Sequence, residues 1–216
     1  MAADLAARFP DAEVIGTDHS PDAIADAIQR HPDGRAEYRV ADILHLPFGD
    51  DSFGAVRCER VTQHLTEPDK AIAELVRVLR PRGRLLLIDT DWDSMLPDGS
   101  STLLRERTPE VIAILTGQVS KGDRTAGRTL HRRMIQTGLT DVQAEPVTLV
   151  FDVLADANQL LPLDRHMVMG IMGDHPAAGL CSAWLDALDE CVADHTFLAT
   201  LTIWVASGSK AGVPQP

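Results

Sequence analysis

Short apolar segments alternate with helix-like segments through the first two-thirds of the chain, and this alternation constrains the fold more than any other feature. The strand-like segments lie at 14–17, 38–40, 53–57 and 85–88. Alternation of this kind is typical of a parallel sheet with helices packed on its faces. We therefore predict an α/β fold with a doubly wound, mostly parallel sheet.

Two of the predicted helices have clear start signals. Ser20 precedes Pro21 at the first, where serine is a good N-cap and proline fits the first turn. Thr66 is placed to cap the second, which has Pro68 in its first turn and is predicted to end at 80–83. The apolar run at 85–88 then predicts a strand that is covered on both faces.

The pattern changes after residue 91. Helices are predicted with a start at Thr108 and around 128–135, and a helical stretch at 160–192 is interrupted at 173–176. Strands are predicted at 142–153 and 197–206, and we expect the last strand to pair antiparallel, as is common in mixed sheets. The whole chain, 1–216, is predicted to be one domain.

The composition of the chain disfavours several kinds of binding partner. The net charge of −12 and the pI of about 5.0 disfavour binding to nucleic acid or to an anionic membrane. No apolar run is long enough to cross a bilayer, and the first residues show no signal-peptide pattern. Three cysteines and eight histidines show no metal-ligand spacing, so we expect no metal and a reduced, cytoplasmic setting.

An acidic residue closes the first strand. Asp18 follows the apolar run 14–17, and ligands of open α/β sheets bind at the carboxyl ends of the strands. An acid at this position commonly binds a ribose and lies ~20 residues after a glycine-rich turn. Met1 lies 17 residues before Asp18, so no such turn is in the sequence, and 2–9 is predicted to be the tail of the helix that would follow it.

Four segments together carry a resemblance to a known family. Their order and spacing are similar to those of class I S-adenosylmethionine-dependent methyltransferases, in the branch of small-molecule enzymes that includes the ubiquinone and menaquinone methyltransferases. The segments are 14–21, 41–48, 53–65 and 74–85. The resemblance covers about residues 1 to 92 and is looser beyond. It implies a Rossmann-like sheet, S-adenosylmethionine as cofactor, and a role in small-molecule or secondary metabolism.

The sequence also departs from the family pattern. The family's first strand and glycine-rich loop would lie before Met1, so the domain is predicted to be N-terminally truncated. Arg82 stands where the family usually has the first glycine of a Pro-Gly-Gly turn, which costs little unless that backbone needs a positive φ. Gly54 stands where the family usually has an aspartate.

The resemblance assigns cofactor contacts to two consecutive loops. Asp18 would accept hydrogen bonds from the ribose hydroxyls, with His19 beside it, and Asp42 would accept one from the adenine amino group. Ile43 would offer its backbone and an apolar wall. The structural alternatives are a helix-capping Asp18, which Ser20 makes less necessary, and a turn aspartate at position 42.

Three further residues follow the next strand of the family pattern. By position, Cys58 and Glu59 face the methionine end of the cofactor and the methyl acceptor. Cys58 could equally be a small buried hydrophobe, and Glu59 a solvated charge. His64 is a candidate general base, although a packed histidine is the more common occupant of such a junction.

The remaining segments complete the functional hypotheses. Residues 1–92 would form the cofactor-binding half, and 93–135 and 154–194 the helical lid over the methyl acceptor. The first hypothesis is methyl transfer to a small molecule through an oxygen, nitrogen or carbon nucleophile. It requires the missing loop to come either from a segment before Met1 or from a second copy or second chain that completes the sheet. The alternatives are an inactive interaction module and a nicotinamide-dependent oxidoreductase, which the segments 63–65 and 80–81 fit poorly.

Overall fold

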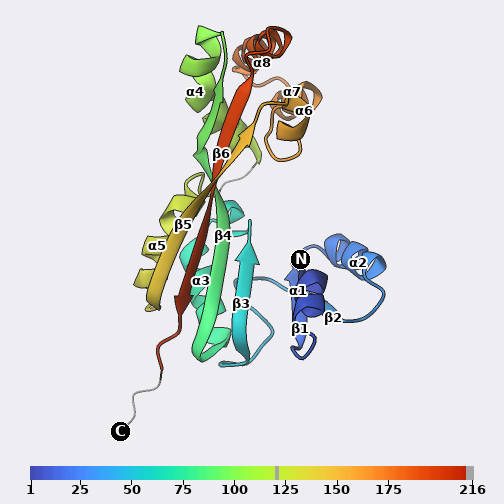
Figure 1. Ribbon diagram of the computed structural model, residues 1–216, viewed down its shortest axis with the longest axis vertical. Helices are drawn as coiled ribbons and strands as arrows, with labels where there is room; N and C mark the ends of the chain where they lie inside the picture. Colours follow the sequence, from blue (N-terminus) through green and yellow to red (C-terminus); the bar gives the residue numbers. More distant parts are fainter. Residues whose placement is uncertain (120–121, 213–216) are drawn as a thin grey trace.

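The strands form two separate sheets in the computed structural model, which describes residues 1–119 and 122–212 (Figure 1). The smaller sheet pairs β1 (Val14–Asp18) with β2 (Ala36–Val40) in parallel. The larger has the order β3-β4-β6-β5, with β3 (Phe53–Glu59), β4 (Leu79–Asp98), β5 (Thr140–Phe151) and β6 (Leu198–Ser209). β3 is parallel to β4, whereas β6 is antiparallel to both neighbours. The α/β class and the antiparallel last strand are thus confirmed.

Two helices accompany the small sheet. They are α1 (Ala2–Arg8) and α2 (Pro21–Arg30). Ser20 caps α2 as predicted, because its hydroxyl accepts from the Ala23 N–H at 3.2 Å. A Cβ atom added at Gly16 would lie 3.0 Å from Ala2 Cβ and 3.1 Å from the Tyr38 ring, so glycine lets β1 lie close to its neighbours.

Two helices cover one face of the large sheet. They are α3 (Pro68–Val78) and α5 (Ala126–Gln136), and they enclose a lower hydrophobic cluster with β4. Leu85 and Leu87 are fully buried in that cluster, whereas Leu86 and Ile88 are half-buried. The face that carries Leu86 and Ile88 is therefore less completely covered than the face on which α3 and α5 pack.

The turns at the ends of α3 also differ from the predictions. Glu67, not Thr66, is the N-cap residue, and no side chain caps that end. Arg82 adopts a φ of 66°, the left-handed conformation that is unfavourable for a residue with a Cβ atom. The arginine in this turn therefore carries the conformational cost that glycine would avoid.

The strands β4 and β6 extend well beyond the lower cluster, and a second cluster surrounds their far ends (Figure 1). The helices there are α4 (Thr102–Val119), α6 (Leu154–Ala157), α7 (Arg165–Met172) and α8 (Ala178–Ala193). Thr108 does not start a helix but lies inside α4, where its hydroxyl accepts from the Trp184 indole at 2.9 Å. The predicted break at 173–176 separates α7 from α8, as expected.

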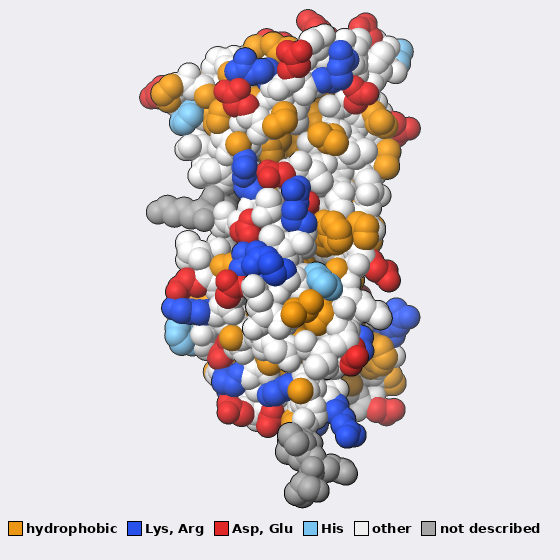
Figure 2. Space-filling view, turned by 90° about the vertical axis from the view of Figure 1, so that its left-hand side faces the viewer, with side chains coloured by type: hydrophobic (Ala, Val, Ile, Leu, Met, Phe, Trp, Pro, Cys, Tyr) orange, Lys and Arg blue, Asp and Glu red, His pale blue; other side chains and the backbone are white. Residues whose placement is uncertain are grey.

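The surface is mixed in character. Figure 2 shows the face that carries α4, α5 and β5, where acidic, basic and hydrophobic side chains are interspersed. Within the described ranges, no helix combines the length and apolar character needed to cross a bilayer.

Candidate functional site

Asp18 lies at the carboxyl end of β1 with one carboxylate oxygen engaged and the other free to accept. Its Oδ1 accepts from the Ser20 backbone N–H at 2.8 Å and lies 3.2 Å from His19 Nδ1. Oδ2 has no hydrogen-bond partner among residues 1–119 and 122–212. The side chain is 47% exposed, so this oxygen can accept a hydrogen bond from a ligand.

Asp42 lies at the same edge of the small sheet. Asp18 pairs with Val40 in the register of β1 and β2, and the Ala41 N–H donates to the Asp18 carbonyl at 2.9 Å. The Leu44 N–H, which donates to Asp42 at 2.9 Å, holds the pKa of this carboxyl below its usual value, with His45 as a second cause. Asp42 is therefore an ionised acceptor close to Asp18.

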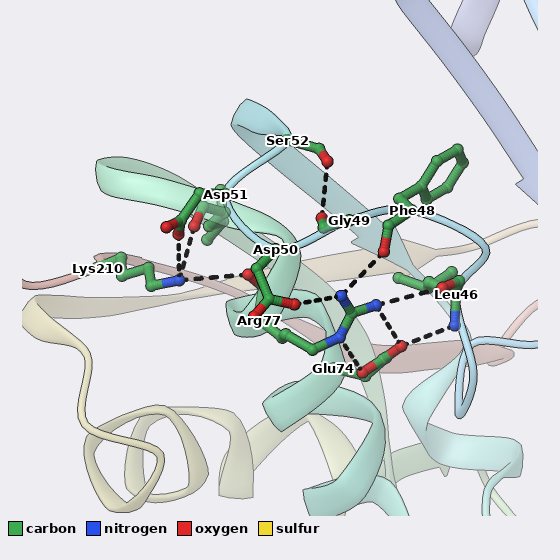
Figure 3. A network of polar contacts seen from close by, with 10 residues as sticks. Leu46, Phe48, Gly49, Asp50, Asp51, Ser52, Glu74, Arg77 and Lys210 are labelled. Atoms are coloured by element: carbon green, nitrogen blue, oxygen red, sulfur yellow. Dashed lines mark hydrogen bonds and ion pairs between the residues drawn. The ribbon is translucent and has the colours of Figure 1, made fainter.

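The connection from β2 to β3 is tied to α3 by Arg77, which pairs with Asp50 of the connection at 2.7 Å, and by Glu74. Figure 3 shows Arg77 between Glu74 and the backbone of this connection. Its guanidinium donates to Glu74 at 2.7 Å, to the Phe48 carbonyl at 2.9 Å and to the Leu46 carbonyl at 3.2 Å. Glu74 in turn accepts from the Leu46 N–H at 2.8 Å. Ile43, which the resemblance places beside the adenine, packs its side chain against the lower cluster.

The same network continues to the last strand. Lys210, just after β6, lies 2.8 Å from the Asp51 carboxylate and 2.7 Å from the Leu79 carbonyl (Figure 3). The Asp51 N–H donates to the Arg77 carbonyl at 3.1 Å. The loop that follows Asp42 is therefore held at both ends by α3 and the C-terminal strand.

Cys58 and Glu59 end β3, and their side chains have different surroundings. Cys58 is 8% exposed in the lower cluster, and burial raises the pKa of its thiol to about 12, with contributions from Asp89 and Glu59. A thiol of this kind is not a nucleophile at neutral pH. Glu59 pairs with Arg57 at 2.5 Å, and both line a cavity of about 310 Å³.

That cavity lies between α1 and the end of β3. Its other lining residues come from α1 and the N-terminus: Met1, Asp4, Leu5 and Arg8. In the described part of the chain, β1 pairs only with β2, and β3 only with β4, so the facing edges of β1 and β3 have no strand partner. The structure thus brings Asp18, His19 and Asp42 together, but no hydrogen bond joins them to Cys58 or Glu59.

A buried carboxylate organises the turn that follows β3. Asp89 is 1% exposed and accepts from Thr62 Oγ1 at 2.5 Å and from the Gln63 N–H at 3.1 Å. The Thr90 N–H donates to its other oxygen at 3.0 Å. Burial raises the pKa of Asp89, although these hydrogen bonds act in the opposite sense. The 3-10 turn η1 (Thr62–His64) is therefore fixed on β4.

His64 is exposed at the end of this turn. Its Nε2 lies 3.0 Å from Gln63 Nε2, and the Gln63 Oε1 accepts from the Trp92 indole at 3.1 Å. His64 is therefore not packed in the core, which is where the structural alternative would place it. It stands instead at the carboxyl end of β3, the edge at which α/β sheets bind ligands.

Two further acids of β4, Asp91 and Asp93, are engaged in ion pairs. Arg128 binds Asp91 through two nitrogens at 2.5 and 2.7 Å, and Arg124 lies 3.4 Å from Asp93. A Cβ atom added at Gly127 would lie 2.5 Å from the Asp89 carbonyl oxygen, so α5 begins in close contact with β4. No group of three or more potential metal ligands gathers within residues 1–119 and 122–212.

Sequence reasoning missed several residues that shape this site. Thr62, Gln63 and Trp92 surround Asp89 and His64, and Glu74 and Arg77 hold the loop after Asp42. The signal available was the i, i+3 spacing of Glu74 and Arg77 in a segment that already carried the family resemblance. Nothing in the sequence signals the indole that meets Gln63.

Comparisons with known proteins find a methyltransferase domain in the first part of the chain. Residues 1–87 match the family model described as a methyltransferase domain. The chain is 32% identical to an uncharacterised 37.1 kDa protein in transposon TN4556 of Streptomyces fradiae, over 91% of this chain and 55% of that protein. It is 30% identical to the methyltransferase GfsG of Streptomyces halstedii, over 72% of this chain and 52% of that protein. The chain spans about half the length of these curated relatives.

Solved structures share the fold. The YcgJ protein of Bacillus subtilis superimposes with a TM-score of 0.62 at 17% identity, over 98% of this chain and 89% of that chain. Phosphoethanolamine N-methyltransferase 2 of Haemonchus contortus, in complex with phosphomonomethylethanolamine and S-adenosylhomocysteine, superimposes with a TM-score of 0.56 at 21% identity. It is matched over 97% of this chain and 46% of that chain. These likenesses show that the chain has a Rossmann-like α/β fold.

Proposed function

The chain belongs to the class I S-adenosylmethionine-dependent methyltransferases, and from that membership we propose that it transfers a methyl group from S-adenosylmethionine to a small-molecule acceptor. The nucleophile is an oxygen, nitrogen or carbon atom of the acceptor. One observation carries the proposal: Asp18 and Asp42 stand at one edge of a parallel strand pair, each as a hydrogen-bond acceptor.

The residues at this edge fit the nucleoside part of the cofactor. The unpartnered Oδ2 of Asp18 would accept from a ribose hydroxyl, and His19 would stand beside it. Asp42 would accept from the adenine amino group, and the backbone at Ile43 would lie along the base. Glu59, beside the cavity of about 310 Å³, would face the methionine end, with Cys58 as a buried wall.

Methyl transfer from S-adenosylmethionine requires mainly that the protein positions the cofactor and the acceptor. When bound, the cofactor supplies a methyl group on a positively charged sulfur. The residues of this chain would hold the two reactants in line and exclude water. The helices α4, α6, α7 and α8 are our candidates for binding the methyl acceptor, whereas α5 packs in the lower cluster. The proposed lid therefore excludes 126–135.

The facing edges of β1 and β3 support a second proposal about assembly. Each edge offers backbone N–H and C=O groups without a strand partner in the described part of the chain. Such edges invite pairing with another strand. We propose that a second copy or a second chain occupies this position. Size-exclusion chromatography with light scattering is expected to show an assembly larger than one chain, and a stable monomer would contradict it.

Isothermal titration with S-adenosylmethionine tests the main proposal. We expect a dissociation constant in the micromolar range, and D18A should weaken it by at least about tenfold because the ribose loses an acceptor. D11A removes an exposed aspartate that has no hydrogen-bond or ion-pair partner among residues 1–119 and 122–212, and it should leave the affinity unchanged. Absence of binding by the wild-type chain, with cooperative unfolding intact, would favour the inactive interaction module.

A further inference from the structure

Gln63 lies between an indole and an imidazole, and its amide has one orientation that suits both. Its Oε1 lies 3.1 Å from Trp92 Nε1, and its Nε2 lies 3.0 Å from His64 Nε2. An indole N–H can only donate, so the amide oxygen must face Trp92. The amide NH₂ therefore faces His64. Since that group also only donates, the Nε2 atom of His64 must present a lone pair.

The reverse orientation leaves donors unpaired. Turning the amide would place its NH₂ against the Trp92 N–H, with two donors in contact. Gln63 is 3% exposed, so water has little access to separate them. A buried donor without an acceptor is unfavourable by about 1–3 kcal/mol. The arrangement with the oxygen on the indole is therefore strongly preferred.

The backbone around this pair is held on three sides. The Gln63 N–H donates to buried Asp89, and the Trp92 N–H donates to the Arg124 carbonyl at 2.8 Å. A Cβ atom added at Gly122 would lie 1.9 Å from the Gln63 carbonyl oxygen, so a third segment closes tightly on the turn. The indole and the amide therefore have little freedom to rearrange.

We propose that His64 is fixed in the Nδ1–H tautomer and presents this N–H as a hydrogen-bond donor, with Gln63 and Trp92 as its positioning residues. Nδ1 has no hydrogen-bond partner among residues 1–119 and 122–212, and the side chain is exposed. Neutral His64 cannot take a proton at Nδ1 in this form, and Gln63 occupies Nε2. The general-base role expected from the sequence is thereby replaced by donation to a ligand lone pair, such as a carbonyl or carboxylate oxygen.

The inference rests on the proposed function only in taking the turn as part of a ligand site, and its test needs neither cofactor nor turnover. We would record long-range ¹H–¹⁵N correlations of the histidine rings of the full chain at about pH 8.5, where histidine is ordinarily neutral. H64Q identifies the signals of His64 by their loss. The Nδ1–H form is expected in at least about tenfold excess. A majority of the Nε2–H form would overturn the proposal.

Two variants separate the positioning residues from a general packing role. Q63E replaces the amide by a group that accepts from both neighbours, so His64 should change to the Nε2–H form. W92F removes the indole donor, and the tautomer ratio should move towards an even mixture. Circular dichroism confirms folding, and if W92F fails to fold, Q63E still decides the question. Retention of the Nδ1–H form in Q63E would contradict the inference, whatever the titration with S-adenosylmethionine shows.

Discussion

Thr62 Oγ1 lies 2.5 Å from Asp89 Oδ2, and both side chains are almost completely buried, so a short hydrogen bond joins the turn after β3 to the centre of β4. The same carboxylate accepts from two backbone N–H groups. The two donors that lie in η1, Thr62 Oγ1 and the Gln63 N–H, account for the position of this turn, and through it for the position of His64. The first prediction therefore concerns Asp89.

D89N should lower stability and remove part of its pH dependence. An amide cannot accept from all three donors, so one backbone N–H loses its acceptor at a cost of about 1–3 kcal/mol near neutral pH. Burial raises the pKa of Asp89 in the folded protein above its unfolded value near 3.8. The folded wild type therefore binds this proton more tightly and gains stability as the pH falls through the raised pKa. Urea titrations should show the gap between wild type and D89N widening on acidification; a constant gap would contradict this.

R82G should stabilise the protein. Arg82 has a φ of 66°, and the left-handed conformation costs a residue with a Cβ atom about 1 kcal/mol relative to glycine. Its backbone N–H donates to the Lys210 carbonyl at 2.9 Å, a bond that glycine retains. The expected gain is about 1 kcal/mol in a urea titration. G83A is the matched control: its Cβ would lie 2.8 Å from the Arg80 carbonyl oxygen, so it should destabilise.

The length of β4 shows which features the sequence can predict and which it cannot. The apolar run 85–88 predicts a strand, with Asp89 directly after it as its expected end. The strand instead continues to Asp98, since Thr62 and η1 satisfy Asp89 and Arg128 satisfies Asp91. Those partners are distant in sequence, so local pattern could not reveal them.

The candidate site likewise combines residues that the local sequence reveals with contacts that only the folded chain shows. The acids at strand ends, Asp18 and Asp42, were found from local pattern and resemblance, and the β1–β2 register places them at one edge. The tautomer of His64 depends on Trp92, a contact made by folding. That β1 and β3 each have an edge without a strand partner in the described part of the chain likewise depends on how distant strands pair.

G127A should destabilise the protein by about 1–3 kcal/mol because it overpacks the start of α5. The added Cβ would lie 2.5 Å from the Asp89 carbonyl oxygen and 3.0 Å from a Trp204 ring carbon. G170A, inside α7, meets no atom within 4 Å and should instead stabilise by about 0.5–1 kcal/mol through helix propensity. Thermal melts of both variants measure the contrast, and equal effects would show that α5 can move away from β4.

E74Q should loosen the connection that carries Asp42. The Oε1 atom of Glu74 accepts from both Arg77 and the Leu46 N–H, and Oε2 accepts from Arg77 as well, so an amide would turn a donor towards at least one of these N–H groups. Because Glu74 is 17% exposed, water replaces the lost interaction poorly, and we expect a loss of about 1–2 kcal/mol. Amides of 44–51 should exchange faster by mass spectrometry. E110Q changes an i, i+3 pair of the same kind that is half exposed, and should cost less than about 0.5 kcal/mol. Unchanged exchange at 44–51 in E74Q would mean that this ion pair does not position the loop.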